Sequence, residues 1–111
     1  MAWRVVGLSL QMAVGDYGIS LPVSVSGATF GEGDELRFTF NNGPGSNTIL
    51  TKTYSNIQDN TVNLSFTEAE STLFRVGNYA YGMDWYQNGL FMCNVIESSP
   101  FRVVRKELNR A

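Results

Sequence analysis

The sequence predicts an all-β protein: an antiparallel sandwich of about seven to eight short strands with one short helical crossover. Two observations lead to this prediction. Apolar and polar residues alternate in short runs, which is the period of a half-buried strand. Turn residues such as Gly, Asn and Asp separate these runs at short intervals. The chain has 111 residues, the length of one domain, so we expect a single sandwich over residues 1–104 and a basic tail over residues 105–111.

The first half of the chain contains four runs with strand character. They cover residues 8–14, 21–25, 36–40 and 48–54, and the third run alternates most clearly. The sequence "GDYG" that follows the first run predicts a hairpin turn between the first two. Pro22 has no amide proton, so we expect the second run to lie at a sheet edge or to carry a bulge.

The second half of the chain begins with an alternating run over residues 62–66 and then changes period. "TEAE" fits a capping box, in which the Thr67 hydroxyl accepts from the Glu70 amide and the Glu70 carboxylate reaches back. We therefore expect a helical turn or two from Glu68 to about Phe74. Its role is to cross from one sheet to the other.

A hairpin follows the predicted helix. Asn88-Gly89 is a strong signal for a two-residue type I′ turn, because both positions of that turn need positive φ. This turn pairs Tyr86 with Phe91 and Trp85 with Met92. We expect the larger face of the hairpin to lie in the core, with Tyr79, Tyr81, Met83, Trp85, Met92 and Ile96 on it. The opposite face then holds Ala80, Gly82, Asp84, Tyr86, Phe91, Cys93 and Val95, and a last strand covers residues 101–104.

The strand from Phe91 to Ile96 is apolar on both faces, whereas a sandwich sheet in water needs only one apolar face. Its second face offers Tyr86, Phe91 and Val95. Either a loop or the tail of the same chain covers this face, or another chain does. The second alternative makes these three side chains candidate interface residues and predicts a multimer.

The net charge of −2 is unevenly distributed. Residues 1–101 carry four basic and nine acidic side chains, a net charge of −5, whereas residues 102–111 carry four basic and one acidic, a net charge of +3. Nucleic-acid binding needs a basic stripe, so we expect no nucleic-acid partner. The tail is either a solvated segment or a basic arm that docks on an acidic neighbour, such as another copy of the chain, through Arg105 and Lys106.

The residues needed for common reaction centres are missing from the sequence. It has no histidine, which excludes Ser-His-Asp and Cys-His arrangements, and its one cysteine, Cys93, excludes an internal disulfide and a cysteine-based zinc site. We expect no enzyme activity, no catalytic residue, no cofactor and no metal. The N-terminus lacks the features of a signal peptide, and no apolar run approaches about 18 residues, so we expect synthesis in the cytoplasm and no membrane span.

Several motifs follow one another along most of the chain, roughly residues 8 to 104. They are "MAVGDYGISLPVSV", "GDELRFTF", "LSFTEAESTLFRVGNYAYGMDWYQNG" and "FRVV". Their order resembles a small β-sandwich module of phage and prophage tail or baseplate proteins, such as the N-terminal domain of upper baseplate proteins. The part with Leu73, Gly77, Tyr79 and Tyr81 also suits immunoglobulin-like domains, in which a tyrosine hydroxyl binds the backbone of the crossover.

The resemblance implies an immunoglobulin-like sandwich that serves as a non-enzymatic structural or adaptor protein of a phage or prophage particle. Its partners would be itself or other phage structural proteins, and it would be a virion component made in the bacterial cytoplasm. Two alternatives remain open. One is a carbohydrate-binding module, in which Tyr17, Tyr54 and Tyr86 stack on sugar rings. The other is a free-standing immunoglobulin-like domain that binds protein.

Overall fold

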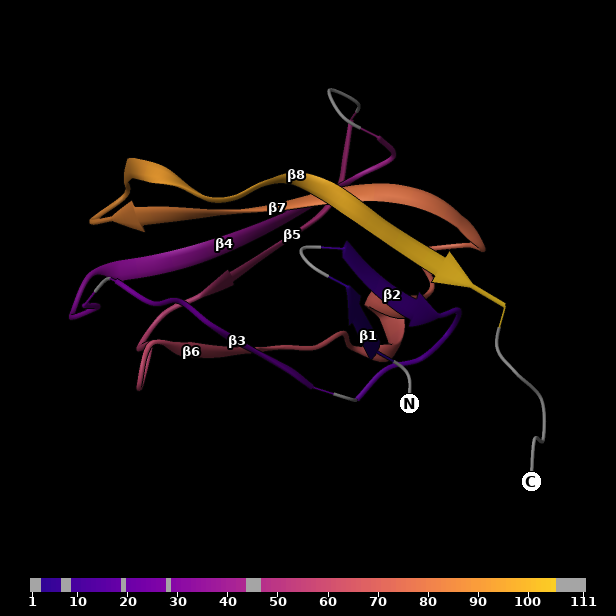
Figure 1. Ribbon diagram of the computed structural model, residues 1–111, viewed down its shortest axis with the longest axis horizontal. Coiled ribbons are helices and arrows are strands. Elements are labelled where there is room, and N and C mark those ends of the chain that lie inside the picture. Colours follow the sequence, from indigo (N-terminus) through magenta and orange to yellow (C-terminus); the bar gives the residue numbers. More distant parts are fainter. Residues whose placement is uncertain (1–2, 7–8, 19, 28, 44–46, 106–111) are drawn as a thin grey trace.

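The protein is all-β, with two sheets and one short helix (Figure 1). The computed structural model describes residues 3–6, 9–18, 20–27, 29–43 and 47–105. The larger sheet has six strands in the order β1-β2-β8-β7-β4-β5, and β3 and β6 form the smaller sheet. The elements are β1 (Trp3–Val6), β2 (Ser9–Ala13), β3 (Leu21–Ser24), β4 (Asp34–Asn41), β5 (Thr48–Tyr54), β6 (Thr61–Leu64), α1 (Glu68–Ser71), β7 (Gly77–Gln87) and β8 (Leu90–Val104).

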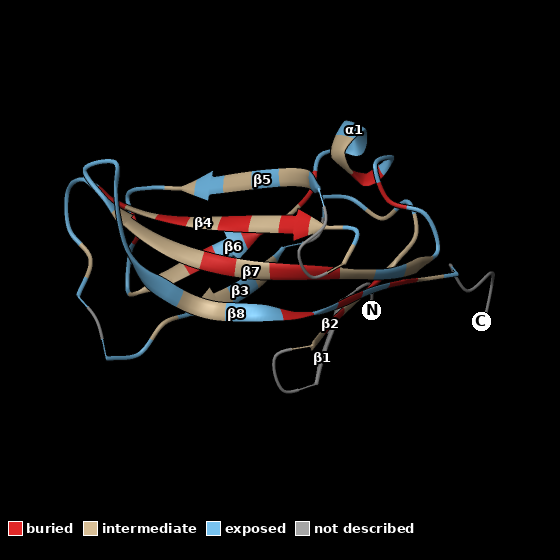
Figure 2. Ribbon diagram, turned by 90° about the horizontal axis from the view of Figure 1, so that it is seen from above, coloured by how far each residue is buried: buried red, intermediate tan, exposed pale blue. Residues whose placement is uncertain are grey.

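Strands β4 and β5 lie where the sequence predicted them. Along β4 buried residues alternate with intermediate ones, as the period of two requires (Figure 2). The hairpin between β7 and β8 turns at Asn88 and Gly89, whose φ angles of 49° and 83° are both positive. The capping box at Thr67 is also confirmed, although α1 ends at Ser71 rather than near Phe74.

Two local expectations are wrong, and one strand was not expected. "GDYG" does not close a hairpin, because β2 lies in the larger sheet and β3 in the smaller, so this turn links the two sheets. The strand expected at 101–104 is the end of β8, which continues through Pro100. Pro100 lies opposite Ala80 of β7, and β2 pairs with β8 only from Phe101 onward, so the side of β8 that faces β2 is unpaired at this proline. The sequence analysis also did not anticipate β1.

Strand pairing is antiparallel throughout the described sheets except between β2 and β8, which run parallel. The pairing joins Leu10 to Phe101 and Ala13 to Val104. It covers only the last part of β8. The expectation of a fully antiparallel sandwich therefore holds for all described pairs but this one.

The core lies between the two sheets and is rich in aromatic rings. Phe40 is fully buried, and its ring centroid lies 5.1 Å from that of Phe101, 5.4 Å from Phe66 and 5.8 Å from Phe74. These rings come from β4, β8 and the two ends of the helical crossover. Contacts of this edge-to-face kind add to the burial of apolar area. The aromatic cluster therefore joins the crossover to the larger sheet.

Tyr79 lies at the start of β7 and binds the backbone just before it. Its hydroxyl accepts a hydrogen bond from the Arg75 amide at 2.9 Å and donates one to the Arg75 carbonyl at 3.0 Å. The sequence analysis gave this role to Tyr79 or Tyr81, and Tyr79 fills it. The bonds hold the crossover against the strand that it enters.

We expect Tyr79→Phe to lower the free energy of unfolding by about 1–2 kcal/mol, because both hydrogen bonds to Arg75 are lost. Urea titration followed by tryptophan fluorescence measures the change. Tyr17→Phe is the matched control, since Tyr17 is 51% exposed and its change should stay within about 0.5 kcal/mol. Equal effects of the two substitutions would contradict the role of the Tyr79 hydroxyl.

Candidate functional site

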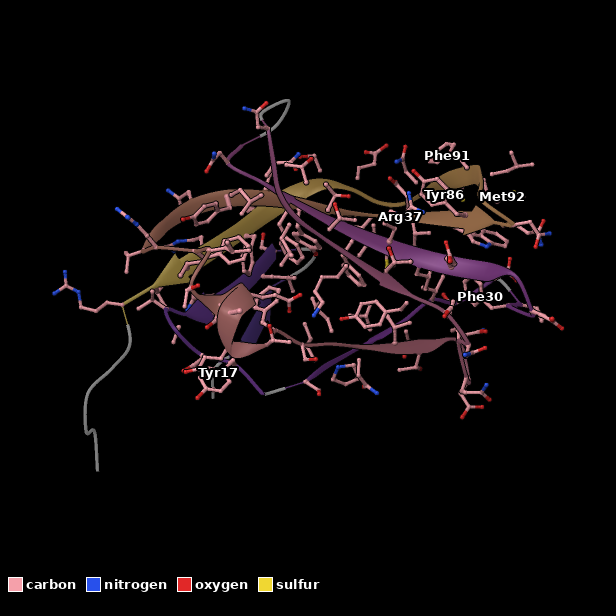
Figure 3. The ribbon with its side chains drawn as sticks, turned by 180° about the vertical axis from the view of Figure 1, so that it is seen from behind. Tyr17, Phe30, Arg37, Tyr86, Phe91 and Met92 are labelled. Atoms are coloured by element: carbon pink, nitrogen blue, oxygen red, sulfur yellow. The ribbon has the colours of Figure 1, made fainter. Side chains whose placement is uncertain are left out.

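The tip of the β7–β8 hairpin exposes three consecutive apolar side chains. Leu90 is 71% exposed, Phe91 54% and Met92 46%. They form what we call the tip patch. The patch follows the type I′ turn directly and so lies at one end of the molecule (Figure 3). Large apolar side chains gathered on a surface mark sites of interaction.

Two of the three register shifts between β7 and β8 explain why the tip patch differs from the face expected from the sequence. Tyr86 pairs with Phe91 as expected, but Trp85 pairs with Cys93 instead of Met92. Met92 is therefore an extra residue of β8, and it is exposed rather than in the core. Val95 is a second extra residue. It packs against the core, so it does not share a surface with Tyr86 and Phe91.

Tyr86 is covered in part by its own chain. The Arg37 guanidinium carbon lies 3.9 Å from the centre of the Tyr86 ring, a cation–π contact. The Phe91 ring meets that of Tyr86 edge to face, with centroids 5.7 Å apart. Glu35 approaches Arg37 at 3.6 Å. Side chains of the same chain thus partly cover the Tyr86 ring, while Phe91 remains more than half exposed.

The buried carboxylate of Asp34 bonds the turn before β4 to strand β7 near the hairpin tip. Asp34 is only 4% exposed, and its oxygens accept hydrogen bonds from the Gly31 amide at 2.7 Å and from the Trp85 indole at 3.0 Å. These bonds lower the pKa of Asp34, so it is ionised at neutral pH. The Asn88 amide donates to the Gly33 carbonyl at 2.9 Å. The turn before β4 and the hairpin tip are therefore held together by polar contacts.

Among the described strands, the part of β8 beside the tip patch pairs with a neighbouring strand on one side only. In the described part of the chain, residues 90–98 pair with β7 alone, because β2 begins to pair at Phe101. A groove of about 370 Å³ opens between this edge and β3, with Leu21, Val23, Tyr81, Met83, Val95 and Ile96 among the side chains that line it. An unpaired strand edge offers backbone hydrogen-bond groups to a partner.

The opposite end of the molecule exposes a second set of apolar side chains: Tyr17, Leu73 and Val76, which are 51%, 47% and 56% exposed. Arg105, one of the predicted arm residues, is exposed at this end, just beyond β8. Lys106, the other predicted arm residue, lies outside the described residues. The predicted interface set therefore divides between the two ends and the core.

The tyrosines of the carbohydrate alternative do not share one surface. Tyr17 and Tyr86 lie at opposite ends of the molecule (Figure 3). Tyr54 is only partly exposed, and its ring packs edge to face on Phe38 at 5.7 Å while its hydroxyl accepts from the Ser65 amide. A sugar-binding platform built from all three is not formed.

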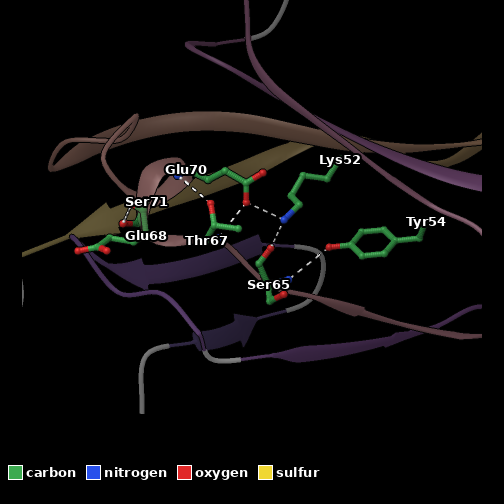
Figure 4. Close-up of polar contacts among 7 residues, drawn as sticks. All are labelled: Lys52, Tyr54, Ser65, Thr67, Glu68, Glu70 and Ser71. Atoms are coloured by element: carbon green, nitrogen blue, oxygen red, sulfur yellow. Dashed lines mark hydrogen bonds and ion pairs between the residues drawn. The ribbon is translucent and has the colours of Figure 1, made fainter.

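Lys52 makes polar contacts that the sequence analysis did not anticipate. It lies on β5 with its ammonium group 2.7 Å from the Glu70 carboxylate and bonded to the Ser65 carbonyl, so it joins the larger sheet to the crossover (Figure 4). Burial by itself would raise the pKa of Glu70, but hydrogen bonds from Lys52 and Thr67 outweigh it and lower the pKa below 4.5. The carboxylate therefore stays ionised over a wider range of acid pH.

We expect the Lys52–Glu70 pair to stabilise the fold above the ordinary pKa of glutamate, and this contribution to be lost as the pH falls through the lowered pKa. At pH 7 the free energy of unfolding of the Glu70→Gln variant should be about 1 kcal/mol lower than that of the native chain. The difference should shrink toward pH 3. Urea titrations of both proteins across this range measure it, and a difference that grows in acid would contradict the assignment.

Comparison with known proteins gives no significant match, whether with protein-family models, with curated proteins or with solved structures. Within the described ranges, no group of three His, Cys, Asp or Glu side chains is placed to hold a metal ion. None of the helices in those ranges has the length and apolar character to cross a membrane.

Proposed function

We propose that this protein is a non-enzymatic structural or adaptor component of a phage or prophage particle, of the tail or baseplate type, and that it acts by protein–protein assembly. The observation that carries the proposal is the tip patch, with Leu90, Phe91 and Met92 exposed beside an unpaired edge of β8. Apolar side chains next to free backbone groups are suited to a protein partner. The order of the sequence motifs supports the assignment to a particle.

We propose that the sandwich is immunoglobulin-like. In variable-type immunoglobulin domains, strands G, F, C and C′ are neighbours in one sheet and B and E in the other. The order β8-β7-β4-β5 and the pair β3-β6 follow that arrangement. The Tyr79 hydroxyl bound to the Arg75 backbone at the crossover corresponds to the tyrosine corner of such domains.

The protein-binding role is favoured over sugar binding by the surroundings of Tyr86. Stacking on a sugar needs an open ring face, but Arg37 lies over this ring and Phe91 contacts it. The exposed side chains beside it, Leu90 and Met92, are aliphatic and offer no flat surface. Such a patch is suited to a protein surface of similar character.

The proposal is tested by asking whether the chain is part of a particle. Particles from the phage or the induced prophage that encodes the chain are purified by density gradient, and their proteins are measured by quantitative mass spectrometry. We expect the chain in constant stoichiometry with the tail proteins and gold-labelled antibody at the tail. Its absence from purified particles, with the free chain left in the lysate, would overturn the proposal.

A further inference from the structure

The large apolar side chains that are exposed in the described part of the chain gather at its two ends. Leu90, Phe91 and Met92 form the tip patch, and Tyr17, Leu73 and Val76 lie at the other end. The second group is brought together by the fold. Gly18 donates to the carbonyl of Phe66 just before α1, and Leu73 and Val76 follow α1. We call this group, with Arg75, Arg102 and Arg105, the crossover end.

The two ends carry opposite charge. Around the tip patch lie four carboxylates, those of Glu32, Asp34, Glu35 and Asp84, against one guanidinium, Arg37, a net charge of −3. At the crossover end three exposed guanidinium groups, those of Arg75, Arg102 and Arg105, lie near two carboxylates, those of Asp16 and Glu68, a net charge of +1. Glu70 is neutralised by its ion pair with Lys52.

We propose that the tip patch of one copy docks on the crossover end of the next copy, in a head-to-tail contact. The contact places apolar side chains against apolar side chains and the acidic end against the arginines. Charge complementarity favours this arrangement over tip-to-tip or crossover-to-crossover pairing, each of which brings like charges together. The proposal rests on the proposed function, because it names the partner through which the chain assembles.

Head-to-tail contacts are heterologous, so they produce a ring when the rotation between copies closes and a filament when it does not. The molecule is 44 Å long and 27–31 Å across, so its ends are small surfaces. Contacts of less than about 1,200 Å² are typical of weak association. We therefore expect association in the micromolar range for the free chain and stronger binding where a particle holds many copies together.

Two variants of the full-length chain separate the two halves of the contact. Phe91→Ser with Met92→Ser removes apolar side chains at the tip, and Arg102→Ser with Arg105→Ser removes charge at the crossover end. Thr51→Glu with Asn63→Glu is the matched control, since Thr51 on β5 and Asn63 on β6 are exposed and this change lowers the net charge by two, as the arginine variant does. Circular dichroism and thermal unfolding check that each variant is folded.

Sedimentation velocity from about 10 to 500 µM, in low and high salt, measures association. We expect the native chain and the control to form oligomers larger than a dimer that weaken with salt. Each variant alone should associate at least about tenfold more weakly. An equimolar mixture should give a one-to-one dimer and nothing larger, because the intact crossover end of the tip variant binds the intact tip of the arginine variant.

Other outcomes overturn the inference. Dimers of the arginine variant alone indicate tip-to-tip pairing, and dimers of the tip variant alone indicate pairing of crossover ends. If the control associates as weakly as the arginine variant, the loss of association is caused by the net charge and not by the arginines at the crossover end. A native chain that stays monomeric yet is found in purified particles refutes head-to-tail self-association and leaves the proposed function standing. A chain that associates as expected but is absent from particles refutes the function and not the contact.

Discussion

Replacing Phe40 with alanine is expected to lower the free energy of unfolding by about 3–5 kcal/mol. Phe40 is fully buried, and its ring contacts rings on β8, on β7 and on both sides of α1. Truncation leaves a cavity that neighbouring strands are unable to fill without breaking their pairing. Since domains of this size are stable by about 5–15 kcal/mol, the loss takes a large part of the total.

Phe40→Leu is the control for this substitution. It keeps most of the apolar volume, so its free energy of unfolding should fall by less than half of the decrease expected for the alanine variant. Guanidinium titration followed by circular dichroism measures both variants. A loss below about 1 kcal/mol for Phe40→Ala would show that the aromatic cluster does not hold the crossover against the larger sheet.

Gly33→Ala is expected to destabilise the protein by about 2 kcal/mol, through strain and collision together. Gly33 has a φ of 88°, which an L-residue rarely adopts. An added Cβ would also collide with the side-chain oxygen of Asn88 at the hairpin turn. The substitution therefore strains the contact between the turn before β4 and the tip.

Gly31→Ala is the matched control for Gly33→Ala. Gly31 has no positive φ, and apart from its chain neighbours no atom of the described residues lies within 4 Å of the position that an added Cβ would take. Its amide can still donate to Asp34 after the change. We expect its free energy of unfolding to change by less than about 0.5 kcal/mol or to rise slightly. Thermal unfolding of both variants measures the difference. Equal stabilities would contradict the strain assigned to Gly33.

The elements that could be predicted from the sequence are those determined by neighbouring residues. The capping box at Thr67 needs only four residues, and the type I′ turn at Asn88 needs two. The alternation of Leu36, Phe38 and Phe40 reports a single strand and its buried face. In each case the signal and the structure lie within one short segment, so no knowledge of distant contacts is required.

The features that could not be predicted depend on contacts between distant segments. The turn at residues 15–18 looks the same whether it joins paired strands or two sheets, and the pairing of β2 with β8 decides between them. Bulges at Met92 and Val95 move both side chains away from the face that strict alternation gives. Lys52 lies in a predicted strand, and only the position of Glu70 in the folded chain makes it a contact between the larger sheet and the crossover.

The candidate site was predicted in part, for the same reason. Phe91 was found because a strand apolar on both faces leaves one face without cover, a property of a short segment. Tyr17 is separated from Leu73 and Val76 by dozens of residues, and the two segments come together only in the folded chain. No local pattern marks such a surface, and the charge difference between the ends appears only when residues are placed in space.

Strand β8 carries the tip patch at its start, and Arg102 near its finish lies at the other end of the molecule. If copies join end to end, mechanical load passing through such an assembly would travel along this strand. Hydrogen bonds between antiparallel strands lie at right angles to the strand direction, and load that enters and leaves through β8 passes along its extended covalent backbone without pulling its bonds to β7 apart one by one. The module would then resist tension far better in this direction than when its sheet is peeled from one edge.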